Sequence, residues 1–148
     1  MTIRDARPED APRLAELVSD AYGHYVERLG FTPRPMTEDY AEVVRQKRVL
    51  VAERHGEIAG MVVLVTEDEG FFIDNVVVDP ALQGTGIGRA LLERAEAEAL
   101  AAGHASIHLF TAAGMTENLA LYGRIGYSEY DRRVFGEAEI LYLRKELR

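Results

Sequence analysis

The residues that point most clearly to a chemical role form a glycine-rich loop between an apolar stretch and an amphipathic one. Residues 76–92 read VVVDPALQGTGIGRALL, with Gly84, Gly86 and Gly88 at alternate positions. Glycine lets the backbone approach a ligand with its N–H groups outward, and the first turn of a helix offers amides that have no internal partner. Such amides bind phosphate groups, although the same glycines could serve only to turn a strand into a helix.

This loop differs from two familiar nucleotide-binding loops. It does not match the dinucleotide fingerprint G-x-G-x-x-G, and it lacks the Lys-Ser/Thr pair of the ATP and GTP phosphate loop. The stretch from Gln83 to Gly88 instead fits the pattern Q/R-x-x-G-x-G/A. In this respect it resembles the acyl-CoA pyrophosphate loop of the GNAT superfamily of N-acetyltransferases.

A second segment carries the same resemblance. Residues 115–122 read MTENLALY and are followed by Gly126 and Tyr127, which is similar to the N…LY…GF segment of the superfamily. Many members have the Asn seven residues before the Tyr, where this chain has Met115, and the Met-Thr-Glu-Asn form resembles that of a bacterial subgroup. The resemblance covers nearly all 148 residues in the same order.

The resemblance implies a fold and a co-substrate. The fold is α/β, a single GNAT-like domain over residues 1–148, with a mixed, mostly antiparallel sheet flanked by about four helices and with central strands splayed at the coenzyme site. The co-substrate is acetyl-CoA, and no metal is implied. Its pantetheine arm would lie against the backbone of Val76, Val77 and Val78, whose apolar side chains any core strand could carry. The other implied coenzyme contacts are Gln83, Gly84, Thr85, Gly86, Ile87, Gly88, Arg89, Asn118 and Tyr122.

Tyr122 is the residue that we expect to be catalytic. When an amine attacks the acetyl carbonyl, the leaving group is a thiolate, and a neutral phenol with a pKa of about 10 can hydrogen-bond it or give it a proton. Asn118 lies four residues earlier, on the same helical face, where its amide could reach the pantetheine or a water beside the phenol. Outside this segment, Tyr122 would indicate only a buried aromatic, and Asn118 only a residue that bonds its local backbone.

A base is also required, because an ammonium acceptor must lose a proton before it attacks. In several relatives a Glu serves, at a position that corresponds to Phe72 here. Asp74 lies two residues further along the strand, on the same face, and could act directly or through a water, or could simply bond a neighbouring backbone group. The amide of Val76 is expected to polarise the acetyl carbonyl. The chain has no cysteine, so the transfer would be direct.

The acceptor side is expected within residues 22–40, which concentrate aromatic and acidic side chains. In the superfamily this region covers the acceptor side of the cleft. Tyr25, Asp39 and Tyr40 are the candidate contacts, and they would suit a cationic or amphipathic amine. A helix face and a proline-stiffened loop packed on a core give the same pattern. The sequence does not decide whether the acceptor is a protein N-terminus, a lysine, a polyamine, an amino acid or an antibiotic.

The composition favours a soluble globular domain. The chain has 148 residues, of which 47% are hydrophobic, enough for one core. A net charge of −8 disfavours a nucleic-acid partner, and the four histidines show no metal-ligand spacing. The sequence has no long apolar run and no N-terminal signal-peptide pattern, so we expect no membrane partner and a cytoplasmic location. Monomer and homodimer stay open.

The sequence bears on three classes of function. The leading interpretation is an acetyl-CoA-dependent N-acetyltransferase that acts on a primary amine. The alternative is a non-catalytic acyl-CoA-binding sensor or regulatory module, in which Tyr122→Phe would have no effect. An interaction domain with a vestigial site is disfavoured by the unbroken glycine loop.

The hydrophobic pattern predicts the elements that position these residues. We expect a helix that Asp10 caps and that ends near Leu29, followed by a second helix capped by Thr37. A third helix runs from Gly86 to about Ala102, and a fourth covers residues 116–125. The expected strands cover residues 2–4, 48–53, 57–66, 71–78, 106–110, 127–135 and 138–147.

Overall fold

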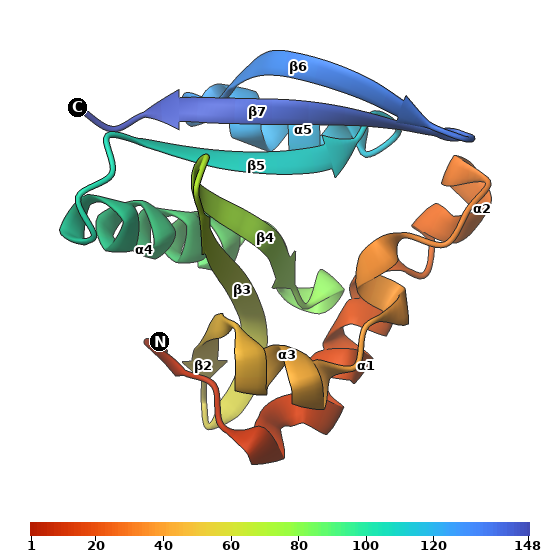
Figure 1. Cartoon of the computed structure of the whole chain (residues 1–148). Helices are drawn as coiled ribbons and strands as arrows, with labels where there is room; N and C mark the ends of the chain where they lie inside the picture. The colour runs from red at the N-terminus through yellow and green to blue at the C-terminus, as the bar shows by residue number, and fades with distance from the viewer.

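The computed structural model describes all of residues 1–148 and contains a seven-stranded sheet with helices on both faces (Figure 1). The strand order is β1-β2-β3-β4-β5-β7-β6, and every neighbouring pair is antiparallel except β4 and β5. The predicted α/β class and mixed sheet are confirmed. The strands are β1 (Thr2–Asp5), β2 (Arg48–Arg54), β3 (Glu57–Glu67), β4 (Gly70–Val78), β5 (Ser106–Ala112), β6 (Ser128–Phe135) and β7 (Ala138–Glu146). The helices are α1 (Ala11–Tyr22), α2 (Tyr25–Leu29), α3 (Tyr40–Gln46), α4 (Ile87–Ala101) and α5 (Thr116–Arg124), with short 3-10 turns η1 (Pro8–Asp10), η2 (Arg34–Thr37) and η3 (Pro80–Leu82).

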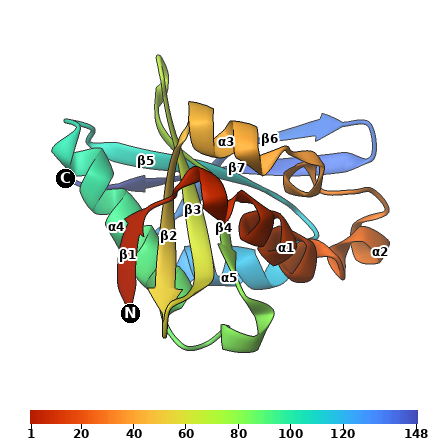
Figure 2. The ribbon, with the colours of Figure 1, turned by 90° about the horizontal axis from the view of Figure 1, so that it is seen from below.

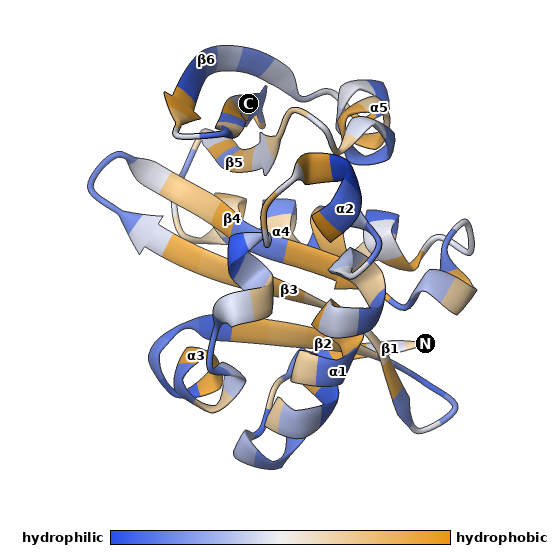
Figure 3. Ribbon diagram, turned by 90° about the vertical axis from the view of Figure 1, so that its right-hand side faces the viewer, coloured by the Kyte–Doolittle hydropathy of each residue, from blue (hydrophilic) through white to orange (hydrophobic).

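Strand β3 runs through the centre of the core because its side chains alternate between two layers of helices. Met61 and Val63 pack with α1 and α3, whereas Val62 and Leu64 pack with α4. Figure 2 shows α1 and α3 in front of the strands and α4 behind them, on the opposite face of the sheet. In Figure 3, strands β2, β3 and β4 are largely hydrophobic. None of the helices is long and apolar enough to cross a membrane.

Strands β4 and β5 pair only briefly and then separate. The register joins Phe72 with His108 and Ile73 with Leu109, whereas the rest of β4 continues along β3 as far as Val78. The two strands diverge toward the side where α2 lies (Figure 1). The predicted splay of the central strands is confirmed, and it opens the sheet in its middle.

A β-bulge marks the point of separation. Val63 of β3 is in register with Asn75 and Leu64 with Ile73, so Asp74 is an extra residue in β4. A bulge of this kind bends a strand and increases its local twist. It therefore redirects the half of β4 that leaves β5.

The first predicted helix is wrong in its length and in its cap. It is interrupted after Tyr22, because the N–H of Val26 bonds the carbonyl of Gly23, three residues back instead of four. The carboxylate of Asp10 does not cap α1. It instead accepts hydrogen bonds from Arg4 and from the N–H of Arg7, which joins β1 to the turn η1.

The predicted cap of the next helix is also wrong. The hydroxyl of Thr37 donates to the carbonyl of Arg34 within η2, so Thr37 ends that turn. Helix α3 is capped by Asp39, whose carboxylate accepts a 3.0 Å hydrogen bond from the N–H of Ala41.

Candidate active site

Two adjoining cavities lie where β4 and β5 separate. The larger has a volume of about 540 Å³ and lies between the end of β4, the glycine-rich loop and α5. The smaller, of about 100 Å³, lies between β4, β5 and the segment around η2. The residues that line both cavities are Tyr22, Val76, Asn118 and Tyr122. These residues therefore form the boundary at which a group in one cavity would meet a group in the other.

The glycine-rich loop presents free backbone N–H groups beside the larger cavity. Gly84 has a φ of +83° and Gly86 a φ of +90°, in the left-handed region that glycine adopts at least cost. These turns lead into α4, whose first amides have no acceptor within the protein. The N–H groups that make no internal hydrogen bond belong to Gly84, Gly86, Ile87, Gly88 and Arg89. Such an array fits the phosphates of a coenzyme.

Two of the predicted loop side chains do not line this cavity. The hydroxyl of Thr85 donates to the carbonyl of Leu82, and Ile87 is buried in the core. Any contact that these two make with a coenzyme would therefore use the backbone. Arg89 does line the cavity, with an exposed side chain that pairs with Glu93 at 3.2 Å. The other predicted loop residues that line it are Gln83, Gly84, Gly86 and Gly88.

The end of β4 has one free edge. Val76, Val77 and Val78 are in register with β3 and have no partner in β5. The N–H of Asp79 bonds the carbonyl of Ala59 in β3. Every second residue of a strand bonds toward the same neighbour, so Val77, two residues before Asp79, also bonds toward β3. By alternation, the N–H and C=O groups of Val76 and Val78 point to the open side. An extended ligand could therefore hydrogen-bond along this edge.

Tyr122 lies at the boundary of the two cavities. It is 5% exposed, and its ring packs at 5.9 Å from the ring of Tyr127 in an edge-to-face arrangement. Burial raises the pKa of Tyr122 strongly, with smaller contributions from Tyr22 and Tyr25. The phenol is therefore neutral, and able to donate a hydrogen bond, throughout the physiological pH range.

Asn118 lies one helical turn before Tyr122, as predicted, and lines both cavities. Its Nδ2 group is 3.8 Å from the sulfur of Met115, which is buried and also lies 3.7 Å from the hydroxyl of Thr111. The Nδ2 group of Asn118 therefore contacts the Met115 sulfur, and the Oδ1 atom of Asn118 is left for a ligand in either cavity.

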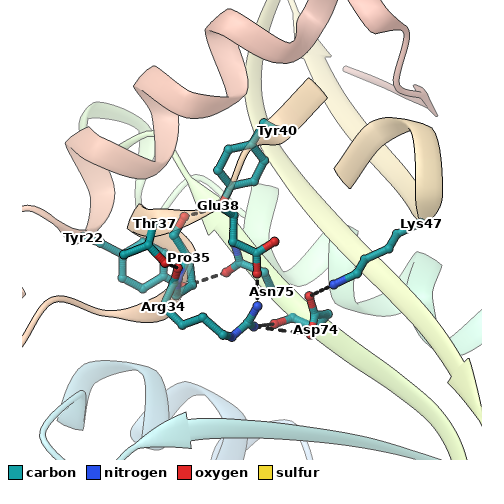
Figure 4. Close-up of polar contacts among 9 residues, drawn as sticks. All are labelled: Tyr22, Arg34, Pro35, Thr37, Glu38, Tyr40, Lys47, Asp74 and Asn75. Atoms are coloured by element: carbon teal, nitrogen blue, oxygen red, sulfur yellow. Dashed lines mark hydrogen bonds and ion pairs between the residues drawn. The ribbon is translucent and has the colours of Figure 1, made fainter. Parts of the chain in front are cut away.

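Asp74 lies in the wall of the smaller cavity, where two cations hold its carboxylate (Figure 4). Oδ1 is 3.3 Å from Nη2 of Arg34, and Oδ2 is 3.0 Å from Nζ of Lys47. Phe72 lies nearer the paired start of the strands, where its ring stacks at 5.0 Å on His108, and it does not line the cavity. The prediction did not include either cation, because both come from elements remote in sequence.

Of the predicted acceptor contacts, Tyr25 lines the larger cavity instead of the smaller one. Its hydroxyl donates a 2.9 Å hydrogen bond to Glu117 at the start of α5, and Arg28 pairs with the same carboxylate at 2.9 Å. Burial, followed by the Glu117 contact, raises the pKa of Tyr25 to about 12. These residues link α2 to α5 across the opening.

The other two predicted acceptor contacts line neither cavity. The carboxylate of Asp39 caps α3, and the buried Tyr40 donates from its hydroxyl to the carbonyl of Pro35 at 2.6 Å. Both residues position the segment around η2, and the structure gives neither of them a place in the wall of a cavity.

A buried pair that was absent from the predicted site joins α1 to β4. The hydroxyl of Tyr22 donates a 2.8 Å hydrogen bond to Oδ1 of Asn75. Both residues line the smaller cavity, and both are less than 10% exposed. The bulge at Asp74 directs Asn75 toward α1, so simple strand alternation could not have placed it. The only sequence signal was a polar pair, Asp-Asn, inside an otherwise apolar strand.

The chain is similar in sequence to known acetyltransferases. The model of the acetyltransferase (GNAT) family matches residues 11–127. The chain is 38% identical over 91 residues to an IAA acetyltransferase of Azospirillum brasilense, covering 60% of this chain and 58% of that protein. It is 32% identical over 136 residues to the mycothiol acetyltransferase of Jonesia denitrificans, covering 84% of this chain and 42% of that protein. The chain thus spans about half the length of the curated relatives that it matches.

The fold agrees with solved structures as well. The chain superposes on the PaiA N-acetyltransferase of Thermoplasma acidophilum, solved in complex with coenzyme A, with a TM-score of 0.82, 16% identity and 98% of both chains covered. The match of residues 11–127 contains the glycine-rich loop, the free edge of β4 and Tyr122. By this match, the chain belongs to the acetyltransferase (GNAT) family.

Proposed function

We propose that this protein transfers the acetyl group of acetyl-CoA directly to a primary amine. The observation that carries the proposal is the position of Tyr122, a buried, neutral phenol at the boundary of two cavities. In this proposal the larger cavity holds the coenzyme and the smaller one holds the acceptor. The thioester would lie between them, beside Val76 and Tyr122.

The coenzyme side is supported by backbone geometry. The free amides of the glycine-rich loop and the start of α4 suit the pyrophosphate, and the exposed Arg89 adds a positive charge. The free edge at Val76 and Val78 suits the amide groups of the pantetheine arm, and the Asn118 side chain lies beside it. These local groups have to outweigh the net charge of −8, which repels a polyanion at long range.

The reaction proposed for this site balances without a covalent enzyme intermediate. The acceptor ammonium first loses one proton to a base, and the free amine then attacks the acetyl carbonyl carbon. A C–N bond forms, and the amide of Val76 stabilises the charge on the carbonyl oxygen. As the C–S bond breaks, Tyr122 gives its proton to the thiolate and recovers one from the nitrogen. The products are the N-acetyl amine, CoA and one proton released to solvent.

The base in this scheme is Asp74 or a water that it holds. Asp74 lines the acceptor cavity two residues from Val76, which supports the proposal. Each of its oxygens is engaged by one cation, Arg34 or Lys47, so the exchange of one of these contacts would leave an oxygen open to the acceptor.

The proposal is tested by calorimetric titration of acetyl-CoA together with CoA release against a panel of primary amines. Tyr122→Phe is expected to keep the affinity for acetyl-CoA and to lower kcat by about 10²–10⁴-fold. The exposed Tyr130 lies outside both cavities, so Tyr130→Phe is the matched control and should retain full activity. Binding without amine-dependent CoA release, and with no effect of Tyr122→Phe, would favour the acyl-CoA sensor instead.

The cellular setting belongs to the same proposal. A cytoplasmic enzyme of a bacterium is proposed, because acetyl-CoA is an intracellular metabolite and the segment MTENLALY resembles that of a bacterial subgroup. A homodimer is the alternative to a monomer, and light scattering on the purified protein distinguishes the two.

A further inference from the structure

The smaller cavity differs in charge from the surface of the protein. The whole chain carries a net charge of −8, yet the charged residues that line this cavity are one cation and one anion, Arg34 and Asp74. The remaining wall is made of apolar and neutral polar groups. The apolar part includes Phe31, Pro33 and Phe110. The cavity therefore presents one positive and one negative group side by side in apolar surroundings.

Arg34 is held by contacts that a ligand can exchange. Its guanidinium lies between Glu38 and Asp74 (Figure 4). It also lies 5.6 Å from the ring centroid of Phe110. Its Nη2 group is 3.2 Å from the carbonyl oxygen of Asp74 and 3.3 Å from Oδ1, both long distances for a charge-assisted hydrogen bond. The side chain is 42% exposed, so the ion pair contributes little to stability and water already reaches it.

Asp74 keeps a counter-ion when Arg34 turns away. Lys47 at the end of α3 bonds Oδ2 at 3.0 Å and does not line the cavity. A ligand that displaces Arg34 from Oδ1 would thus leave Asp74 anchored by Lys47 and open at one oxygen. That oxygen would face the cavity.

A second donor lies beside them. Because Oδ1 of Asn75 is engaged by Tyr22, the Nδ2 group of Asn75 is the end of the amide that is left for the smaller cavity. Beside the neutral side chains of Tyr22, Thr111, Asn118 and Tyr122, the cavity thus offers two donors suited to a carboxylate, on Arg34 and Asn75, and one charged acceptor suited to an ammonium, on Asp74.

We infer that the acceptor is a zwitterion of the amino-acid type, a primary amine that carries a carboxylate a few atoms away, with an apolar body. Its carboxylate takes the place of Asp74 on Arg34, and its ammonium takes the place of Arg34 on Asp74. The exchange frees Oδ1 of Asp74 to receive the ammonium proton, and the amine is left beside the thioester. Arg34 is then the specificity-determining residue. This inference rests on the proposed acetyl transfer.

A polycation fits the same cavity poorly. Asp74 and Glu38 are both neutralised by cations that the protein supplies, so a second ammonium group would meet Arg34 instead of a free carboxylate. An amine without a carboxylate would leave Arg34 in place on Asp74 and would have to find another base.

The inference is tested with sets of matched amines and CoA release as the readout. Each set contains an L-amino acid, its carboxamide and the amine that lacks the carboxyl group, with small and large apolar side chains represented. We expect kcat/KM for the best amino acid to exceed that for its carboxamide by about tenfold to a hundredfold, the range of a charge-assisted hydrogen bond. The amine of the carboxamide is less basic, so more of it is unprotonated and able to attack. This difference in basicity favours the carboxamide and therefore works against the expected preference for the amino acid.

Two arginine variants test whether the preference for a carboxylate depends on Arg34. Arg34→Met is expected to remove the preference for the carboxylate by raising KM for the amino acid, while the affinity for acetyl-CoA is unchanged. Arg45→Met is the matched control, because Arg45 is an exposed residue of α3 whose ion pair is with Glu42. It should retain the wild-type preference. Thermal melting checks that each variant is folded.

The possible outcomes separate this inference from the proposed function. Equal kcat/KM for amines with and without the carboxylate, or a preference that survives Arg34→Met, overturns the inference and leaves the transferase intact. A preference for polyamines also overturns it. CoA release with none of the amines, although acetyl-CoA binds, overturns the proposed function and the inference with it.

Discussion

The hydroxyl of Tyr22 and Oδ1 of Asn75 form a buried 2.8 Å hydrogen bond between α1 and the bulged part of β4. The bond fixes which end of the Asn75 amide faces the smaller cavity. It also joins the layer of helices to the strand that carries Asp74 and Val76. The arrangement of polar groups in the smaller cavity therefore depends on a contact between residues 53 positions apart in the sequence.

We predict that Tyr22→Phe destabilises the protein and loosens acceptor binding. The change leaves a buried amide oxygen without a partner, which costs about 1–3 kcal/mol of unfolding free energy. KM for the acceptor should rise more than KM for acetyl-CoA, because Asn75 loses its orientation. Urea unfolding and steady-state kinetics measure both effects. Tyr130→Phe, at an exposed tyrosine, should change neither, and an equal loss in both variants would contradict the prediction.

Glycine substitutions should have opposite effects in two elements. Gly86→Ala forces a φ of +90° on a residue with a Cβ, at a cost of about 1–2 kcal/mol. The cost appears as lower stability if the loop keeps its shape, or as weaker acetyl-CoA binding if the loop relaxes in the free protein. Gly123→Ala in α5 meets no atom within 4 Å and should stabilise the protein by about 0.5–1 kcal/mol. Urea unfolding measures the stability of both variants, and calorimetry measures their affinity for acetyl-CoA. A Gly86→Ala variant with unchanged stability and unchanged affinity would contradict the prediction.

The contact between α2 and α5 should survive in mild acid. Hydrogen bonds from its own backbone N–H, from Tyr25 and from Arg28 lower the pKa of Glu117 from 4.5 to about 2. A depressed carboxyl pKa means that the stabilisation is fully present above pH 4.5 and is lost as the pH falls through 2. Glu117→Gln should therefore lower the denaturant midpoint at pH 5 to 7, and the difference should shrink toward pH 2. Glu137→Gln, at an exposed turn residue, should show no such difference, and a constant difference at every pH would contradict the assignment.

The parts of the site that could be predicted from the sequence are those that local rules determine. The glycines of the loop are required by the positive φ of Gly84 and Gly86, and these conformations expose the amides. Asn118 and Tyr122 lie one turn apart in one helix, so helical spacing alone places them together. The apolar run that ends at Val78 predicts a central strand in the same direct way.

The parts that could not be predicted depend on contacts distant in the sequence. Strand alternation describes β4 correctly until the bulge at Asp74, which no local rule signals and which turns Asn75 toward α1. Arg34 and Lys47 reach Asp74 from elements 40 and 27 residues away. Asp39 and Tyr40 were assigned to the acceptor site because of their residue types. They serve as a helix cap and a loop anchor instead, which such residue types do equally well.

His108 offers a test of buried polarity away from the site. Its ring packs against Phe72 at 5.0 Å and meets Tyr130 in an edge-to-face arrangement at 5.5 Å, and its Nδ1 atom is buried without a hydrogen-bond partner. His108→Phe keeps the stacking, removes the unpaired nitrogen and should add about 1 kcal/mol to the unfolding free energy at pH 8. Burial, with a smaller contribution from Arg144, lowers the pKa of His108, so protonation favours the unfolded chain.

The wild-type protein should therefore lose stability as the pH falls through 6.5, the ordinary histidine value, and the advantage of His108→Phe should grow between pH 8 and pH 5. Urea unfolding of both proteins at several pH values measures this growth. His24→Phe, at an exposed histidine, is the matched control for the replacement of an imidazole by a phenyl ring. A parallel pH dependence for wild type and His108→Phe would mean that His108 is protonated as readily in the folded protein as in the unfolded chain, and would contradict the burial argument.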